Sequence, residues 1–191
     1  MPTIAKSTFG ETVQAGVGKT AQEDAHVGLG GVFKVTCVGE DGKVKWEDTF
    51  HNLVVNVGLQ DMNTQYFKGS GYSATWYLGL VTGPGSGVTY AAADTLASKA
   101  WTEFTNYTGT RKAVTFGTAT TADPSVISNS ASPAAFAISG AGGTVAGAFL
   151  ANVTSGTSGI LFSEGNFTGG DKTVASGDTL NVTYTFNADA V

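Results

Sequence analysis

The end of the chain alternates apolar and polar residues, and this alternation constrains the fold more than any other feature. Residues 179–186 read TLNVTYTF, so Leu180, Val182, Tyr184 and Phe186 fall at every second position. Successive side chains of a β-strand point to opposite faces of a sheet, and the pattern therefore places one apolar row against a core. Similar short stretches recur along the chain, which predicts a protein built mainly of β-strands.

A hairpin near the start of the alternating region is the clearest local element. Apolar residues alternate over residues 32–38, and the run ends at Gly-Glu-Asp-Gly in residues 39–42. Asp-Gly tolerates the positive φ that a tight turn requires. Residues 43–48 then return with Val44 and Trp46 on a common face, which predicts two antiparallel strands.

The remaining elements are short. Leu59, Met62 and Tyr66 share one face of a helix predicted over residues 58–67, which we expect to pack on a sheet. Residues 91–100 are read as a helical turn or a structured loop, and residues 123–133 as a loop. Further strands are predicted at residues 52–56, 76–81, 112–116, 135–138, 145–150, 159–162 and 179–186.

Eight or nine strands at short spacing with one helix favour an antiparallel β-sandwich, with a jelly roll as the leading variant. Strand order stays open, because another Greek-key sandwich fits the same pattern. Residues 31–191 form the predicted sandwich domain. Residues 1–30 are polar and punctuated by glycine, and we interpret them as an extended N-terminal arm, or as a tail without a role.

Composition excludes several classes of function. Only 13% of the residues are charged and the net charge is −5, so neither nucleic acid nor an anionic membrane surface is an expected partner. The single Cys37 can form no intrachain disulfide. The first residues lack the apolar stretch of a secretion signal, and no run of about 18 apolar residues predicts a membrane span.

Motifs that could carry chemistry are weak. Residues 16–20 resemble part of a phosphate-binding loop, but Val13 stands where the full motif needs glycine. His26 and His51 lack the partners of a catalytic or metal site, and Cys37 follows the pattern of a buried thiol. Turn chemistry accounts for the acidic residues Glu40, Asp41, Asp171, Asp178 and Asp189, and the Thr-rich strands account for the Asn-x-Thr sequences at Asn106, Asn152, Asn166 and Asn181.

Two other groups of residues were considered as sites. Aromatic rings can stack on sugars, but core packing is the favoured interpretation of Trp76, Tyr77, Trp101, Phe104 and Tyr107. A glycan hydrolase needs two carboxyl groups in a cleft, and Glu103 with Glu164 is the only pair worth testing. We therefore predict no catalytic, cofactor-binding or metal-binding residues.

Several stretches taken together resemble small structural proteins of tailed bacteriophage virions, and within that group capsid cement or decoration proteins. The resemblance covers most of residues 31–186. It lies in the segments WED at 46–48, HNLV at 51–54, GL at 58–59, WYLGL at 76–80, ADT at 93–95, WTE at 101–103 with Tyr107 and Arg111, GGDKTV at 169–174 and GDTLNVTY at 177–184.

The resemblance implies a protein without enzymatic activity or cofactors. It would be made in the host cytoplasm and would bind the major capsid protein on the outer surface of the virion, as a homo-oligomer with a trimer favoured. There it would bridge capsomers, and the arm at residues 1–30 would contact capsid protein. A tail or fibre component that binds a host glycan is the first alternative, and a small glycan hydrolase is the second.

Overall fold

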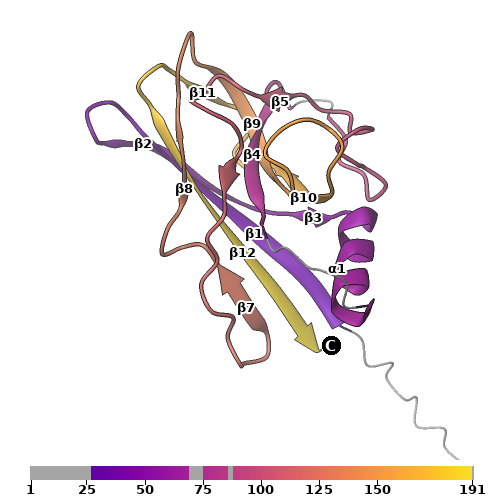
Figure 1. Cartoon of the computed structure of the whole chain (residues 1–191). Coiled ribbons are helices and arrows are strands. Elements are labelled where there is room, and N and C mark those ends of the chain that lie inside the picture. Colours follow the sequence, from indigo (N-terminus) through magenta and orange to yellow (C-terminus); the bar gives the residue numbers. More distant parts are fainter. Residues whose placement is uncertain (1–26, 69–74, 86–87, 191) are drawn as a thin grey trace, which may run out of the picture.

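The computed structural model describes residues 27–68, 75–85 and 88–190, and these form two antiparallel sheets with one helix (Figure 1). The prediction of a mainly β protein with antiparallel sheets and one helix is confirmed. The elements are β1 (Val27–Val38), β2 (Val44–His51), β3 (Leu53–Val54), α1 (Asn56–Lys68), β4 (Tyr77–Thr82), β5 (Glu103–Phe104), β6 (Lys112–Ala113), β7 (Ser125–Ser128), β8 (Ala134–Ala137), β9 (Gly143–Ala151), β10 (Leu161–Asn166), β11 (Lys172–Val174) and β12 (Thr179–Ala190).

The first sheet is organised around one long ladder. Strand order is β2-β1-β12-β7, and β8 also pairs with β12. β1 and β12 pair along their full length, from Val27 opposite Ala190 to Val38 opposite Thr179. Leu180, Val182 and Tyr184 are buried, as the alternation predicts. The hairpin is also confirmed, because β1 pairs with β2 around a turn in which Gly42 has a φ of 76°.

The second sheet has the order β3-β10-β9-β4-β5, and β11 and β6 pair with β9 and β4. One face packs against the first sheet, and the other is covered by a second apolar cluster that includes Leu96, Trp101 and Phe149. Residues 78–81 of β4 are therefore buried on both faces, as the apolar run predicts. Gly79 is required there, because a Cβ atom at this position would overlap the ring of Phe149.

Helix α1 lies against β10 because a glycine allows close approach. A Cβ atom on Gly58 would lie 2.6 Å from the carbonyl oxygen of Phe162. The helix is slightly longer than the predicted 58–67. Tyr66, which the helical pattern assigns to the packed face, is 81% exposed. The face turned towards β10 thus begins with Gly58 and does not extend as far as Tyr66.

Other boundaries also differ from the sequence prediction. β1 begins at Val27, so residues 27–30 belong to the sandwich and not to the arm. β7 at Ser125–Ser128 lies inside the segment predicted as a loop, because its Ser residues hide the strand pattern. The rest of the predicted arm, with the glycine-rich segment 16–20 and His26, lies outside the described residues. The jelly-roll variant stays a prediction.

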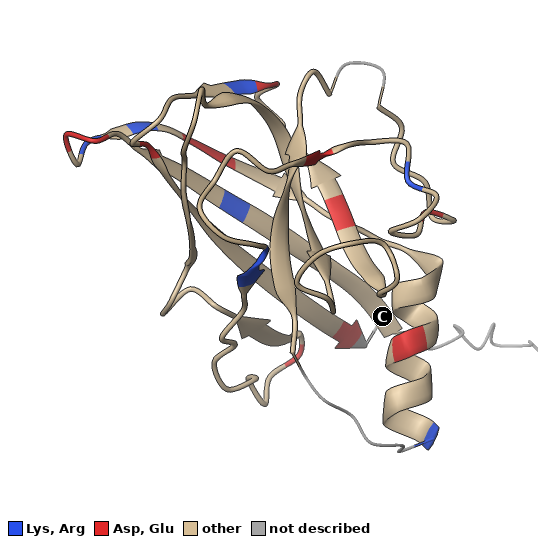
Figure 2. Ribbon diagram, turned by 45° about the horizontal axis from the view of Figure 1, so that its top comes forward, with Lys and Arg blue, Asp and Glu red and all other residues tan. Residues whose placement is uncertain are grey.

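Residues of both charge signs are scattered over the described part of the chain, and neither sign gathers on a single element (Figure 2). Five ion pairs link Lys34–Glu47, Lys43–Asp41, Lys45–Asp178, Arg111–Glu103 and Lys172–Asp48.

Candidate functional site

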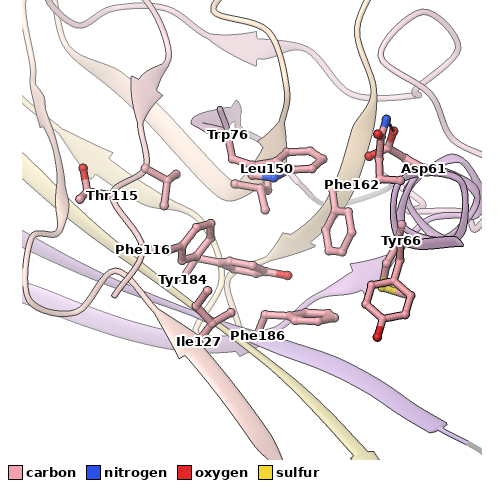
Figure 3. A pocket seen from close by; sticks show the side chains of 13 residues that line it. Asp61, Tyr66, Trp76, Thr115, Phe116, Ile127, Leu150, Phe162, Tyr184 and Phe186 are labelled. Atoms are coloured by element: carbon pink, nitrogen blue, oxygen red, sulfur yellow. Dashed lines mark hydrogen bonds between the residues drawn. The ribbon is translucent and has the colours of Figure 1, made fainter. Parts of the chain in front are cut away.

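An open cavity of about 850 Å³ lies between the two sheets, next to α1 (Figure 3). Its volume is in the range of small-molecule and cofactor sites, which are concave and mostly apolar. The lining side chains come from both sheets, from α1 and from the segment after β6; they are Asp61, Met62, Gln65, Tyr66, Trp76, Val114, Thr115, Phe116, Ile127, Leu150, Phe162, Tyr184 and Phe186.

Strand alternation places most of these side chains. Tyr184 and Phe186 are two residues apart on β12, so both point from the first sheet towards the second. Ile127 on β7 lies directly opposite Phe186 in the ladder. Leu150 on β9 and Phe162 on β10 approach from the second sheet, as Figure 3 shows.

Aromatic rings form nearly half of the lining residues, and several of them contact one another edge to face. Phe162 lies 5.3 Å from Trp76 and 5.5 Å from Phe186 between ring centroids. Phe116 packs on Tyr184 at 6.4 Å. Such edge-to-face pairs add about 0.5–1.5 kcal/mol each beyond the burial of area. The mutual packing holds the rings in place, so the cavity is a preformed apolar space.

The polar groups of the cavity are few. The Gln65 amide Nε2 donates a hydrogen bond to Asp61 Oδ1 at 3.3 Å. That bond fixes which end of the amide is the oxygen, and Gln65 Oε1 is buried without a partner among the described residues. The Tyr184 hydroxyl accepts hydrogen bonds from Asn52 and Ser163, and burial raises the pKa of Tyr184. The cavity thus suits an apolar group.

Exposed aromatic residues extend the apolar surface beyond the cavity. Tyr66 and Phe67, at the end of α1, are 81% and 78% exposed and pack edge to face at 5.0 Å. Val27 is also largely exposed, and Figure 1 shows α1 beside the start of β1. Exposed apolar side chains that adjoin a groove are typical of interaction sites.

The two carboxylates considered for hydrolysis have separate structural partners. Arg111 binds Glu103 through two hydrogen bonds of 2.9 Å and 2.7 Å, and it also donates to two backbone carbonyls, those of Val153 and Gly156. Glu164 is fully buried and accepts a hydrogen bond of 2.7 Å from the indole of Trp101. Neither residue lines the cavity.

Burial raises the pKa of Glu164 to about 8. The nearby Asp94 carboxyl raises it further, whereas the hydrogen bond from Trp101 opposes the shift. Glu164 Oε1 has no hydrogen-bond partner in the described part of the chain. Its carboxyl is therefore a neutral acid over much of the physiological range, held inside the second apolar cluster.

The structure also shows the surroundings of three other residues that the sequence singles out, Cys37, His51 and Asp178. Cys37 is buried, and burial raises its pKa to about 11, as expected for an inert thiol. His51 is exposed at the end of β2. Asp178 accepts bonds from Lys45 and from the backbone of Ala175, which is the turn chemistry predicted. The described residues contain no group of three or more His, Cys, Asp or Glu that could hold a metal ion.

Asparagine side chains of the Asn-x-Thr sequences also serve the fold. Asn106 donates to Gly142, Asn152 accepts from Ile160, and Asn166 accepts from the hydroxyl of Tyr90. These bonds give the three side chains a structural role.

Core packing is confirmed for Trp101, Phe104 and Tyr107, which are all buried. Trp76 is half-buried and packs against the main core, and it also lines the cavity from the segment just before β4. The sequence analysis missed Phe162, Phe186 and the helix residues of the site, which become neighbours only through strand pairing.

Comparisons with known proteins give no relative: no family model matches the chain, and neither do curated proteins or solved structures. Among the described residues no helix has the length and apolar character needed to cross a membrane.

Proposed function

We propose that this protein is a cement or decoration protein of a tailed bacteriophage capsid. In this role it binds the outer surface of the major capsid protein as a homo-oligomer, trimeric by preference, and stabilises contacts between capsomers without catalysis. The sequence stretches that resemble virion structural proteins support the proposal, and β2, β4 and β12 carry several of them. The antiparallel β architecture is compatible with it.

One structural observation carries the proposal. Tyr66 lines the aromatic cavity and packs on the exposed Phe67 near the end of α1, and Figure 1 shows α1 beside the start of β1, where Val27 is exposed. Large apolar side chains exposed next to a groove favour docking of another protein. The N-terminal segment joins the sandwich at the same end, so the predicted arm and this surface can contact the capsid together.

The physical requirements of a cement protein agree with the chain's properties. Many symmetric copies on a capsid bind through multivalency, so each individual contact can be weak. A net charge of −5 favours solubility of the free protein and disfavours binding to packaged DNA.

The first experiment is fractionation of purified virions. Heads and tails are separated, and the protein is quantified by mass spectrometry against the major capsid protein. A high copy number in the head fraction supports the proposal. Absence from both fractions refutes a virion role.

Add-back to capsids that lack the protein tests the docking surface. The double variant Tyr66→Ser, Phe67→Ser is compared with Val44→Ser, a control on β2 whose side chain is 57% exposed. We expect at least tenfold weaker capsid binding for the double variant and unchanged binding for the control. Equal binding by all three proteins refutes the assignment of the surface.

A tail or fibre component that binds a host glycan is the second candidate. The observation in its favour is the indole of Trp76 in an open cavity, because aromatic faces stack on sugars. It predicts low copy number in the tail fraction and a change of Trp fluorescence on addition of host polysaccharide. Neither result is expected of a cement protein.

A further inference from the structure

We propose that, in the free protein, the N-terminal segment of the same chain docks in the aromatic cavity, with Phe9 among the rings. The proposal concerns the isolated protein and does not depend on the capsid function. It starts from the cavity itself: a space of about 850 Å³ walled by aromatic rings is open towards solvent, and covering apolar surface is favourable at roughly 25 cal/mol per Å².

The place where the segment joins the sandwich supports this occupant. β1 starts at Val27, and four residues later Gly31 pairs with Phe186, which lines the cavity. At about 3.3 Å per residue, the attachment point lies roughly 13 Å along the strand from that wall. Residues 1–26 are long enough to cover that distance several times.

The composition of the segment matches the cavity. Its large apolar residues after the initial methionine are Ile4, Phe9, Val13 and Val17, and every other side chain is small, polar or charged. An aromatic ring with two or three aliphatic groups is the kind of occupant that an aromatic wall of this size accommodates.

The polar groups match as well. Asp61 is the only charged residue among the described lining residues, and Lys6 lies three positions before Phe9. Asp61 and Lys6 carry opposite charges, which favours this segment over a purely apolar occupant.

Covalent attachment favours the chain's own segment over a second copy. A tethered segment experiences an effective concentration in the millimolar range, which protein in dilute solution does not reach. Docking within one chain therefore needs only weak affinity. Exchange between copies would give dimers or larger species whose population rises with protein concentration.

Disulfide trapping in the full-length chain tests the contact. Thr8→Cys is combined with Tyr66→Cys at the cavity mouth, and in the control with Glu40→Cys in the β1–β2 turn at the other end of β1. The buried Cys37 remains as it is. We expect an intrachain disulfide in the first pair at least fivefold more abundant than in the control, seen as a faster band on non-reducing gels. Equal yields, or covalent dimers in the first pair, overturn the proposal.

Binding of the apolar dye bis-ANS gives an independent readout. The triple variant Phe9→Ser, Val13→Ser, Val17→Ser is compared with Thr3→Ala, Thr12→Ala, Thr20→Ala, and circular dichroism verifies that both variants fold. We expect dye fluorescence to rise at least threefold in the first variant only. An unchanged signal, or an equal rise in both variants, overturns the proposal. Since no capsid is present in either experiment, the result is separate from the proposed function.

Discussion

The substitution Glu164→Gln should change how the stability of this protein depends on pH. The carboxyl of Glu164 is fully buried, and burial raises its pKa from 4.5 to about 8 in the folded protein. Glutamine keeps the size of the side chain and an oxygen that can accept the bond from Trp101, but it never ionises. The variant therefore removes the titration and preserves the packing.

The direction in which stability changes with pH follows from proton linkage. A carboxyl whose pKa is higher in the folded state binds its proton more tightly there than in the unfolded chain. Its contribution to stability is complete below pH 4.5 and declines as the pH rises towards about 8. Each pH unit within this interval removes up to about 1.4 kcal/mol, or roughly 4–5 kcal/mol over the whole interval as an upper limit.

Urea unfolding followed by circular dichroism at pH 5, 6, 7 and 8 measures the effect. We expect the two proteins to differ little at pH 5, and the variant to be more stable than the native protein by roughly 2–4 kcal/mol at pH 8. Glu47→Gln is the control, because Glu47 is half exposed and pairs with Lys34 on the surface. A stability difference between the native protein and Glu164→Gln that does not vary with pH would refute the reasoning.

Four further predictions concern stability and reactivity. Gly79→Ala should lower the free energy of unfolding by about 1–3 kcal/mol, because the new methyl group overlaps Phe149; similar midpoints of chemical unfolding would contradict this. Arg111→Ala should cost about 3 kcal/mol, because Glu103 and two carbonyls lose their donor, and thermal unfolding measures the loss. Tyr66→Ser should change the unfolding free energy by less than about 0.5 kcal/mol, since that side chain is exposed. Cys37 should react with a thiol reagent such as DTNB only after unfolding, and fast labelling of the native protein at pH 8 would argue against a buried thiol.

Short-range sequence patterns predicted the elements whose structure depends mainly on neighbouring residues. The hairpin around Gly42 and the doubly buried strand β4 follow from residues within a few positions of one another. Tyr66 shares the cavity-facing side of α1 with Met62 but is largely exposed, because helical spacing shows which residues share a side but not where the neighbouring strand ends. The contact of Gly58 with Phe162 sets that limit.

The cavity could not be predicted, because its walls come from distant parts of the chain. Trp76, Phe116, Phe162 and Phe186 become neighbours only when β4, β10 and β12 take their places in two sheets. Strand order depends on long-range pairing that no short window of sequence records. The buried Glu164 is a similar case, since its neighbours Asp94 and Trp101 lie more than sixty positions earlier.

The pairing of β1 with β12 determines the order in which parts of the sandwich can form during synthesis. β1 leaves the ribosome early, but its longest partner, β12, follows only after the whole of residues 39–178. At about 5–20 residues per second, β1 has one free edge for on the order of ten seconds. During that time only β2 can cover it, and the unpaired edge is open to strands of other nascent chains. Completion of the sandwich is therefore a late event, and pairing of this kind with such large sequence separation is intrinsically slow.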